Sequence, residues 1–585
     1  MRSPSRYKFG LLLVALARAI TVCKGSNQHI LGGFNGHSHA ITAEEVIPEG
    51  DYIWENITPT KELVWHGCFK TRECARLLVP LNYTDESGEE AAIALIRVRS
   101  KLPVDSSEYR GPVLFNPGGP GGSGVDFIRG SGDRFAQILG PQFDIVGFDP
   151  RGIGRSIPTA TPFQTGAEMV LWNQQMHIMD GTDDGVPRAW ARAHIFGNLV
   201  HFGNLVQQHA MSYVKHINTE NTARDMLRIT EAHGFSKLQY WGFSYGSVLG
   251  STFASILPDK VGRLVIDGIV DAENYFSTLW SNNLIDTHKT MQSFYDGCYE
   301  AGPEGCPFYA PSPKLIAQNL TSLYNSIRKK PIPVVTGTSY GIMDFVKLRS
   351  TVFSVLYSPF KFFHPLAQAL ADLANGNATA LYKISETPTF KCACGHEPEL
   401  TTTDFTQGFP FLACTDGEPI PSGLDYAKQQ RQGLAESSEW GAMWFNIPLA
   451  CSGWPQFPRT HFQGPFVANT SFPLLIVGNT ADPVTPLWAA KKMSKGFTNS
   501  VVLTQDTAGH CSLSTPSLCT AQHIKSYFVN GSLPAAGTIC EASRSPWPTL
   551  DRGLLSLQST LSVEDRQLLD ASAALSRFAR IPRFF

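Results

Sequence analysis

Gly242-Phe243-Ser244-Tyr245-Gly246 is the stretch of sequence that decides the fold. The apolar segment from Lys237 to Trp241 predicts a short strand before it, and small and apolar residues from Ser247 to Leu257 predict a helix after it. A G-x-S-x-G turn between a strand and a helix holds its serine in a sharp bend, where glycines avoid a clash of Cβ atoms. Ser244 is therefore a candidate nucleophile.

A serine hydroxyl becomes nucleophilic when a base takes its proton, so a histidine and an acid should follow. Asp482 comes just after the apolar run from Phe472 to Gly478, which is typical of a buried strand. His510 comes after a second β-rich run, Ser500 to Leu503. Ser, Asp, His is the chain order of an α/β-hydrolase triad, so we expect His510 to act as base and Asp482 to orient it.

The acid has alternatives in the sequence. Asp267 and Asp271 follow another apolar run, and some hydrolases of this class take their acid from that earlier strand. Asp506 is close to His510 along the chain. Strand-end geometry favours Asp482 over these three.

A glycine-rich loop supplies a candidate oxyanion hole. Residues Asn116 to Gly124 (NPGGPGGSG) follow the apolar strand predicted from Pro112 to Phe115. Backbone N–H groups in such a loop can approach a substrate closely, and we assign the hole to the N–H groups of Gly119 and Tyr245. The loop matches neither a phosphate-binding motif nor a dinucleotide fingerprint, so no cofactor is expected.

A third segment, FDPRGIGRS at Phe148 to Ser156, follows the strand predicted from Phe143 to Gly147. We expect it to shape the floor of the site, with no part in the chemistry.

These motifs together resemble the α/β-hydrolase peptidases related to prolyl iminopeptidase, in particular the secreted tripeptidyl aminopeptidase-like branch. The resemblance rests on NPGGPGGSG, FDPRGIGRS, GFSYGS, GNTADPVTP and AGHC in this order, with further support from WHGCFKTRECARLLVPLNY, ACTDG and the Cys451-x-x-Trp454 pair. It implies exopeptidase activity on short peptides. The chain departs from prolyl iminopeptidases at Asn116, where they carry a histidine, and no motif is recognisable from Gln164 to His216.

The order of the segments predicts a core in two pieces with a lid between them. Strand and helix signals alternate from Ala91 to about Val270 and return from Phe472 to about Phe528, as in a mostly parallel sheet covered by helices. The predicted organisation is a signal peptide (1–25), a first core part (26–273), a mainly helical lid (274–469), a second core part (470–540) and a C-terminal tail (541–585), with a helix from Ser562 to Phe578 that carries no chemistry.

The predicted lid is rich in aromatic residues, a minority of which should line a pocket above Ser244. An aminopeptidase also needs a carboxylate for the substrate's ammonium group, because an unpaired buried charge is costly. The lid and its edge offer six candidates, among which the sequence does not choose: Glu273, Glu397, Glu399, Asp416, Glu436 and Glu439.

The N-terminal residues have the pattern of a targeting segment. Arg2, Arg6 and Lys8 precede an apolar stretch, Phe9 to Val22, that is short for a membrane span and is interrupted by Arg18. It predicts a signal peptide and a secreted protein, with an uncleaved membrane anchor as the alternative. Six N-x-S/T sequons fit a glycosylating pathway: Asn56, Asn82, Asn319, Asn377, Asn469 and Asn530.

Twelve cysteines also suit an oxidising compartment. Three pairs are close enough in the chain to close small loops: Cys68/Cys74, Cys298/Cys306 and Cys511/Cys519. The partners of the remaining cysteines stay open. Cys392-x-Cys394-x-His396 lacks a second ligand pair, so disulfides are favoured over a metal site.

The composition excludes some partners and leaves three classes of function. The chain has 585 residues, 43% of them hydrophobic and 17% charged, and a net charge of -2, which gives no electrostatic footprint for nucleic acid or anionic membranes.

The favoured hypothesis is a secreted serine exopeptidase that acts on free N-termini. An esterase or amidase for a small apolar metabolite is the second, and a non-catalytic binding protein, which the complete triad argues against, is the third. The oligomeric state is left open.

Overall fold

The computed structural model describes residues 54–163, 165–174, 185–202, 212–337, 339–386, 405–551 and 560–578. The predicted signal segment therefore lies outside the described residues, as do Cys392, Cys394, His396, Glu397 and Glu399. Within the described ranges, no helix has both the length and the hydropathy to cross a membrane.

The core is a ten-stranded sheet in the order β1-β2-β3-β5-β4-β6-β7-β10-β11-β12. The first strands pair antiparallel as far as β5, and every pairing from β5 to β12 is parallel. The strands are β1 (His66–Cys68), β2 (Arg72–Pro80), β3 (Glu90–Val98), β4 (Gly111–Asn116), β5 (Phe143–Phe148), β6 (Leu238–Phe243), β7 (Val261–Asp267), β10 (Leu475–Ala481), β11 (Val501–Ala508) and β12 (Ile539–Glu541). The prediction of a mostly parallel α/β sheet is confirmed.

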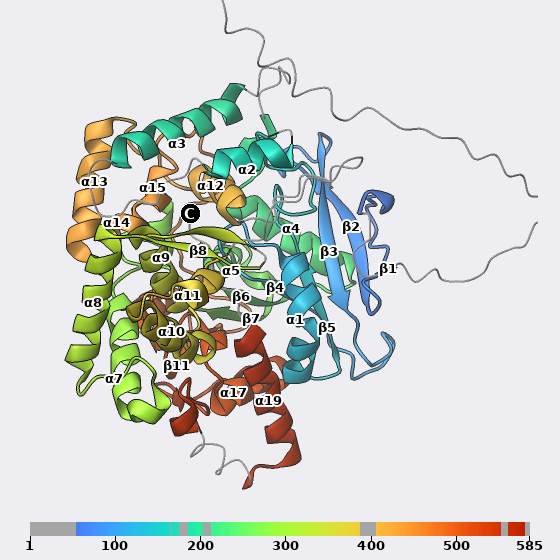
Figure 1. Ribbon diagram of the computed structural model, residues 1–585. Coiled ribbons are helices and arrows are strands. Elements are labelled where there is room, and N and C mark those ends of the chain that lie inside the picture. The colour runs from blue at the N-terminus through green and yellow to red at the C-terminus, as the bar shows by residue number, and fades with distance from the viewer. Residues whose placement is uncertain are drawn as a thin grey trace, which may run out of the picture.

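Helices cover both faces of this sheet, because strands that are apolar on both sides must be buried on both sides. One face packs on α4 (Thr219–Ala232) and α5 (Tyr245–Ile256), and the other on α1 (Gly124–Leu139), α17 (Leu518–Asn530) and α19 (Val563–Phe578). Figure 1 shows α1, α17 and α19 together beside the strands.

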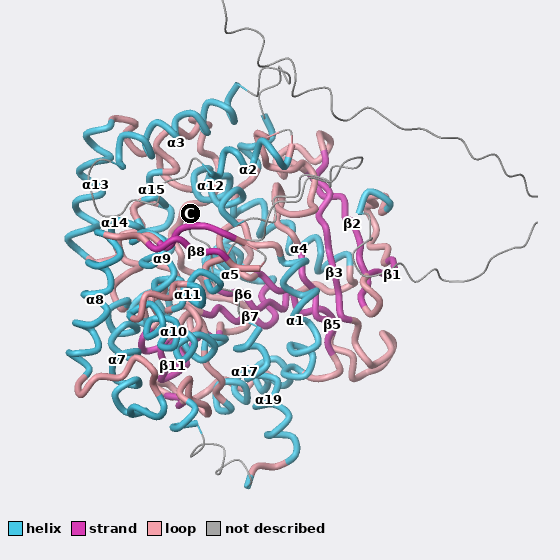
Figure 2. Tube along the Cα trace, in the orientation of Figure 1, coloured by secondary structure: helices cyan, strands magenta, loops and turns pink. Residues whose placement is uncertain are grey.

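In the residues that the structure describes between β7 and β10, the regular elements are helices apart from one hairpin, β8 (Ile332–Val335) with β9 (Tyr340–Met343). Figure 2 shows these helices gathered at one side of the sheet. They are α6 (Ala272–Phe276), α7 (Thr287–Gly305), α8 (Pro313–Lys329), α9 (Phe345–Val355), α10 (Pro359–Ala374), α11 (Thr379–Ile384), α12 (Phe405–Asp416), α13 (Leu424–Ser437), α14 (Gly441–Trp444) and α15 (Asn446–Leu449). We call this segment the lid. The chain before β6 also contributes to it, since Val186 of α3 (Gly185–Phe202) packs with Leu434, Phe445 and Leu449.

Four disulfides lie in the described part of the chain. The predicted pairs Cys68–Cys74 and Cys298–Cys306 are present. The pair Cys511/Cys519 is wrong: Cys519 is bonded to Cys540 across α17 and β12, and Cys511 is a buried free thiol. Spacing suggested the wrong pair because β12 returns to the sheet beside β11 and so brings a distant cysteine next to α17.

The six sequon asparagines all reach the surface. Asn56, Asn319, Asn377, Asn469 and Asn530 are exposed, and Asn82 is partly exposed. All six stay candidate glycosylation sites.

Candidate active site

Ser244 stands in the turn between β6 and α5, with a φ of 56° and a ψ of -119°. A positive φ is uncommon for a residue with a side chain and marks a strained turn. The flanking glycines are needed here, because a Cβ on Gly242 would lie 2.2 Å from the hydroxyl of Tyr240, and one on Gly246 would lie 3.0 Å from the carbonyl oxygen of Asn116. The local sequence therefore presents Ser244 at the carboxyl end of the sheet.

His510 and Asp482 come from the loops that follow β11 and β10, at the same end of the sheet. The His510 Nδ1 lies 3.1 Å from both carboxylate oxygens of Asp482. Asp482 is fully buried and also accepts N–H groups from Val484, Thr485 and Cys511 at 2.9 to 3.0 Å. Burial alone would raise the pKa of Asp482, but His510 and these N–H groups hold it below its ordinary value, which keeps the carboxylate ionised.

Ser244 and His510 line one cavity of about 380 Å³. Among the described residues, no hydrogen bond joins the Ser244 hydroxyl to the imidazole; the His510 Nε2 instead lies 3.6 Å from the Sγ of Cys511. Hydrogen bonds of this kind are often long before substrate binds. On its other side the imidazole packs edge-on against Tyr357, whose ring centroid is 4.9 Å away.

The three alternative acids do not contact His510. Asp267 is fully buried and accepts the backbone N–H of Ser512 at 2.8 Å and its hydroxyl at 2.5 Å. Asp271 pairs with Lys492 at 2.7 Å, and Asp506 is exposed and accepts the hydroxyl of Thr480. Through its hydrogen bonds with Ser512, Asp267 thus stabilises the loop that carries His510, without contacting the imidazole.

Asp267 should make stability depend on pH. Burial raises its pKa to about 6, although Ser512 and Trp241 donate hydrogen bonds that lower it. The unfolded carboxyl ionises near pH 4 and the folded one near pH 6, so rising pH favours the unfolded state across this window by up to about 3 kcal/mol. We expect the free energy of unfolding of the wild type, relative to Asp267→Asn, to fall by about this amount between pH 4 and pH 7. Urea unfolding at several pH values measures it, and a difference that does not change with pH would contradict the assignment.

The glycine-rich loop packs directly on the Ser244 turn. Gly118 has a φ of +92°, and a Cβ there would lie 2.3 Å from the carbonyl oxygen of Phe243, so only glycine allows this approach. The Asn116 side chain accepts the Gly118 N–H at 2.9 Å. Gly119 and Tyr245 both line the cavity beside Ser244. Asn116 therefore shapes the loop at the position where prolyl iminopeptidases carry a histidine.

The segment from Phe148 to Ser156 is structural. Arg151 is fully buried and donates two hydrogen bonds to Asp225, at 2.6 and 2.8 Å. Asp149 accepts the hydroxyl of Ser123 at 2.6 Å and the N–H of Val125 at 3.0 Å, which fixes the start of α1. Neither residue lines the cavity.

Eight aromatic side chains line the cavity, and five of them come from the lid. These side chains are Phe127, Tyr275, Trp280, Tyr357, Phe409, Trp444 and Phe578, alongside Tyr245. None of the lid carboxylates that the structure describes reaches this wall: Glu273 pairs with Lys492, Glu439 with Arg349, Glu436 is exposed, and Asp416 is buried elsewhere. The acidic side chain on the wall is Asp126 of α1, which already pairs with Arg155 at 3.0 Å.

Sequence reasoning missed several residues of the site. The Thr485 hydroxyl lies 3.1 Å from the His510 Nδ1, and the Cys511 thiol lies against its Nε2. Phe578, at the end of α19, closes one part of the cavity, although the C-terminal helix showed no sign of a role. Thr485 and Cys511 lie within three residues of predicted site residues, so proximity in the chain could have identified them.

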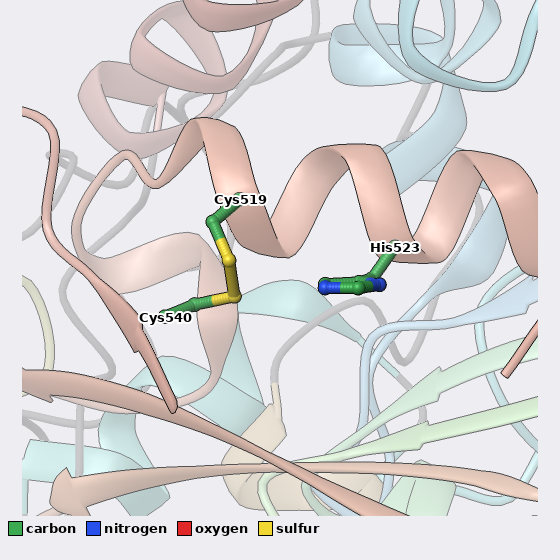
Figure 3. Close-up of side chains that lie close together, drawn as sticks. All are labelled: Cys519, His523 and Cys540. Carbon is green, nitrogen blue, oxygen red and sulfur yellow. A yellow bond between two sulfur atoms is a disulfide. The ribbon is translucent and has the colours of Figure 1, made fainter. Parts of the chain in front are cut away.

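One group of side chains has the composition of a metal site outside this cavity. Figure 3 shows His523 of α17 pointing toward Cys519 and Cys540. The two sulfurs are bonded to each other, and a disulfide offers no thiolate to a metal.

Comparison with known proteins agrees with this architecture. Residues 111–303 match a family described as alpha/beta hydrolase fold, and residues 437–540 match one described as TAP-like protein. The chain is 26% identical over 481 residues to serine protease Hip1 of Mycobacterium tuberculosis, with 80% of this chain and 87% of the relative covered. It is 25% identical to a tripeptidyl aminopeptidase of Streptomyces lividans, with 83% and 87% covered. It is also 25% identical to carboxylesterase B of M. tuberculosis, with 92% and 98% covered.

Proposed function

We propose that this chain, which matches an α/β-hydrolase family over residues 111–303 and a TAP-like family over residues 437–540, is a serine peptidase that forms an acyl-enzyme on Ser244. The observation that carries the proposal is the pairing of His510 Nδ1 with the buried Asp482, on the wall of the cavity that Ser244 also lines. The relatives named as a serine protease and a tripeptidyl aminopeptidase support the same class.

In the proposed reaction, the Ser244 hydroxyl attacks the carbonyl carbon of the substrate while His510 Nε2 takes its proton. The carbonyl oxygen becomes an oxyanion, which the N–H groups of Gly119 and Tyr245 stabilise. His510 then returns the proton to the leaving amine as the C–N bond breaks. Water hydrolyses the resulting ester with the same base, and Asp482 stabilises the imidazolium in both halves.

We propose that the substrates are short peptides with a free N-terminus. The support comes from the relative named tripeptidyl aminopeptidase and from the cavity of about 380 Å³ that Ser244 lines, which can admit the end of a peptide. Two of the predicted ammonium ligands, Glu397 and Glu399, belong to the segment outside the described residues, so they remain candidates for that role.

A second candidate function is an esterase for an apolar acyl group. The aromatic cavity wall favours it, and so does the similarity to carboxylesterase B, which covers nearly the whole of that relative. The same nucleophile, base and oxyanion hole would serve an ester and an amide.

Acetylation of the substrate separates the two candidates. We expect a tripeptide anilide with a free amino group to be cleaved at least about 100-fold faster, in kcat/KM, than its acetylated form, because acetylation leaves a carboxylate in the protein without its partner. The control is a p-nitrophenyl ester of a simple fatty acid. Equal rates for the two anilides, or rapid ester turnover without peptide cleavage, would favour the esterase.

We also propose that the protein is secreted by way of residues 1–25, with an uncleaved membrane anchor as the alternative. The four disulfides suit an oxidising compartment.

A further inference from the structure

A fully buried carboxylate connects the lid to the Ser244 turn. Asp416 ends α12 of the lid, and its carboxylate accepts three hydrogen bonds: the N–H of Thr219 at 2.7 Å, the hydroxyl of Thr219 at 2.6 Å and the hydroxyl of Tyr275 at 2.8 Å. No ion pair joins it to Lys or Arg within the described ranges. Burial raises the pKa of Asp416, whereas His461 and the hydrogen bonds from Thr219 and Tyr275 lower it, and the carboxylate lies at the first residue of α4, where the helix dipole favours an anion.

The donors and acceptors in the hydrogen-bond chain from Tyr245 through Thr219 to Asp416 can be assigned. The Thr219 Oγ1 lies 2.5 Å from the hydroxyl of Tyr245, and the single hydroxyl proton of Thr219 is already donated to Asp416. Burial raises the pKa of Tyr245 well above its ordinary value, so its phenol is protonated and donates to Thr219. The chain therefore runs from Tyr245 through Thr219 to Asp416, and from Tyr275 to Asp416 directly.

Both tyrosines are part of the candidate site. Tyr245 follows Ser244 and supplies one of the two proposed oxyanion N–H groups, while Tyr275 lines the cavity, with its ring centroid 5.7 Å from that of Tyr245. The hydrogen bond at the Tyr245 hydroxyl restricts the rotation of the Tyr245 ring. Because the ring is rigid, the same bond also restrains the backbone N–H of Tyr245.

The lid holds Asp416 firmly in this place. The disulfide Cys414–Cys451 closes the end of α12, and the backbone carbonyl of Asp416 lies 3.1 Å from the His461 Nε2. Two residues on, the N–H of Glu418 donates to the carbonyl oxygen of Phe276 at 2.7 Å, which ties the end of α12 to α6 within the lid. The carboxylate thus has a fixed anchor on the lid side.

We propose that Asp416 is a positioning residue for the reaction, which sets the oxyanion N–H of Tyr245 through Thr219 and the cavity wall through Tyr275. The inference rests on the proposed function, because it requires an oxyanion at Ser244. It also gives the lid a second role, since correct docking of α12 completes the site.

The test measures labelling of Ser244 by a fluorophosphonate, whose phosphoryl oxygen occupies the oxyanion hole, and the hydrolysis of p-nitrophenyl butyrate. Asp416→Asn should slow labelling and lower kcat by about 10- to 100-fold, since small displacements of preorganised donors have effects of this size, with KM changed less than about threefold. Tyr245→Phe keeps the ring and loses the hydrogen bond, and should slow both by about 3- to 10-fold. Asp425→Asn, at an exposed carboxylate of α13, is the matched control and should behave as wild type.

The double variant Asp416→Asn/Tyr245→Phe decides between positioning and general stability. If the two residues act through one chain, the double variant should be slower than Asp416→Asn by less than about twofold. Multiplicative losses, or a loss that only follows the folded fraction, would overturn the inference. If Asp416→Asn does not fold, Tyr245→Phe decides alone, and wild-type rates in that variant would overturn it. Failure of the wild type to label at Ser244 would refute the proposed function instead.

Discussion

Replacement of Ser244 by alanine should abolish labelling by a fluorophosphonate and lower kcat by about 10⁶-fold. No other described hydroxyl shares its combination of a strained turn, a place on the cavity wall and a histidine on the same wall. A residual rate above water should remain, because the proposed oxyanion hole and the cavity are left intact. Intact-mass spectrometry after labelling measures the first effect, and single-turnover kinetics measures the second.

The matched control is Ser247→Ala, one turn further along α5. The Ser247 hydroxyl is bonded to the carbonyl oxygen of Ser244 at 2.6 Å, so this variant perturbs the same turn without removing the nucleophile. It should still label. A Ser244→Ala protein that labels at another residue, or that keeps its activity, would refute the assignment of the nucleophile.

The core could be predicted from the sequence because parallel strands place their carboxyl ends at one edge. Once the runs before Ser244, Asp482 and His510 are taken as strands, the topology of an open α/β sheet brings the following loops together. The observed strands β6, β10 and β11 end later than predicted, by two to five residues, but the loops still follow them directly. Local patterns were sufficient here, since each prediction needed only a strand and the residue after it.

The lid could not be predicted in this detail, because its contacts are made between segments far apart in the chain. Asp416 meets Thr219 across almost 200 residues, and nothing near either residue indicates the partner. Phe578 reaches the cavity only because α19 packs on α1, where its ring lies beside Gly130. Cys519 likewise bonds to Cys540 through the return of β12 to the sheet. Helical periodicity predicts such elements but does not predict what they face.

Asp482→Asn should leave the fold intact and lower kcat by about 10⁴-fold, the second-largest effect that we expect. In the proposed reaction, the carboxylate accepts the His510 Nδ1–H and stabilises the imidazolium. An amide that offers its NH₂ group to Nδ1 would instead select the tautomer in which Nε2 is protonated and cannot take the Ser244 proton. Thr485 would keep a contact with Nδ1 at 3.1 Å, which should preserve the position of the ring.

The decisive comparison sets Asp482→Asn against Asp267→Asn and Asp506→Asn, with the melting temperature of each variant measured beside its kcat. Asp267 accepts two hydrogen bonds from Ser512 and makes no contact with His510. Asp267→Asn should therefore change how the free energy of unfolding depends on pH, and it should lower kcat far less than Asp482→Asn does. Asp506 is exposed, so its variant should match wild type in both measurements. A larger effect on kcat from Asp267→Asn than from Asp482→Asn, in folded protein, would place the acid on β7. The hydrogen bonds of Asp482 to His510 would then be structural, and the loop after β10 would serve to hold the histidine instead of to polarise it.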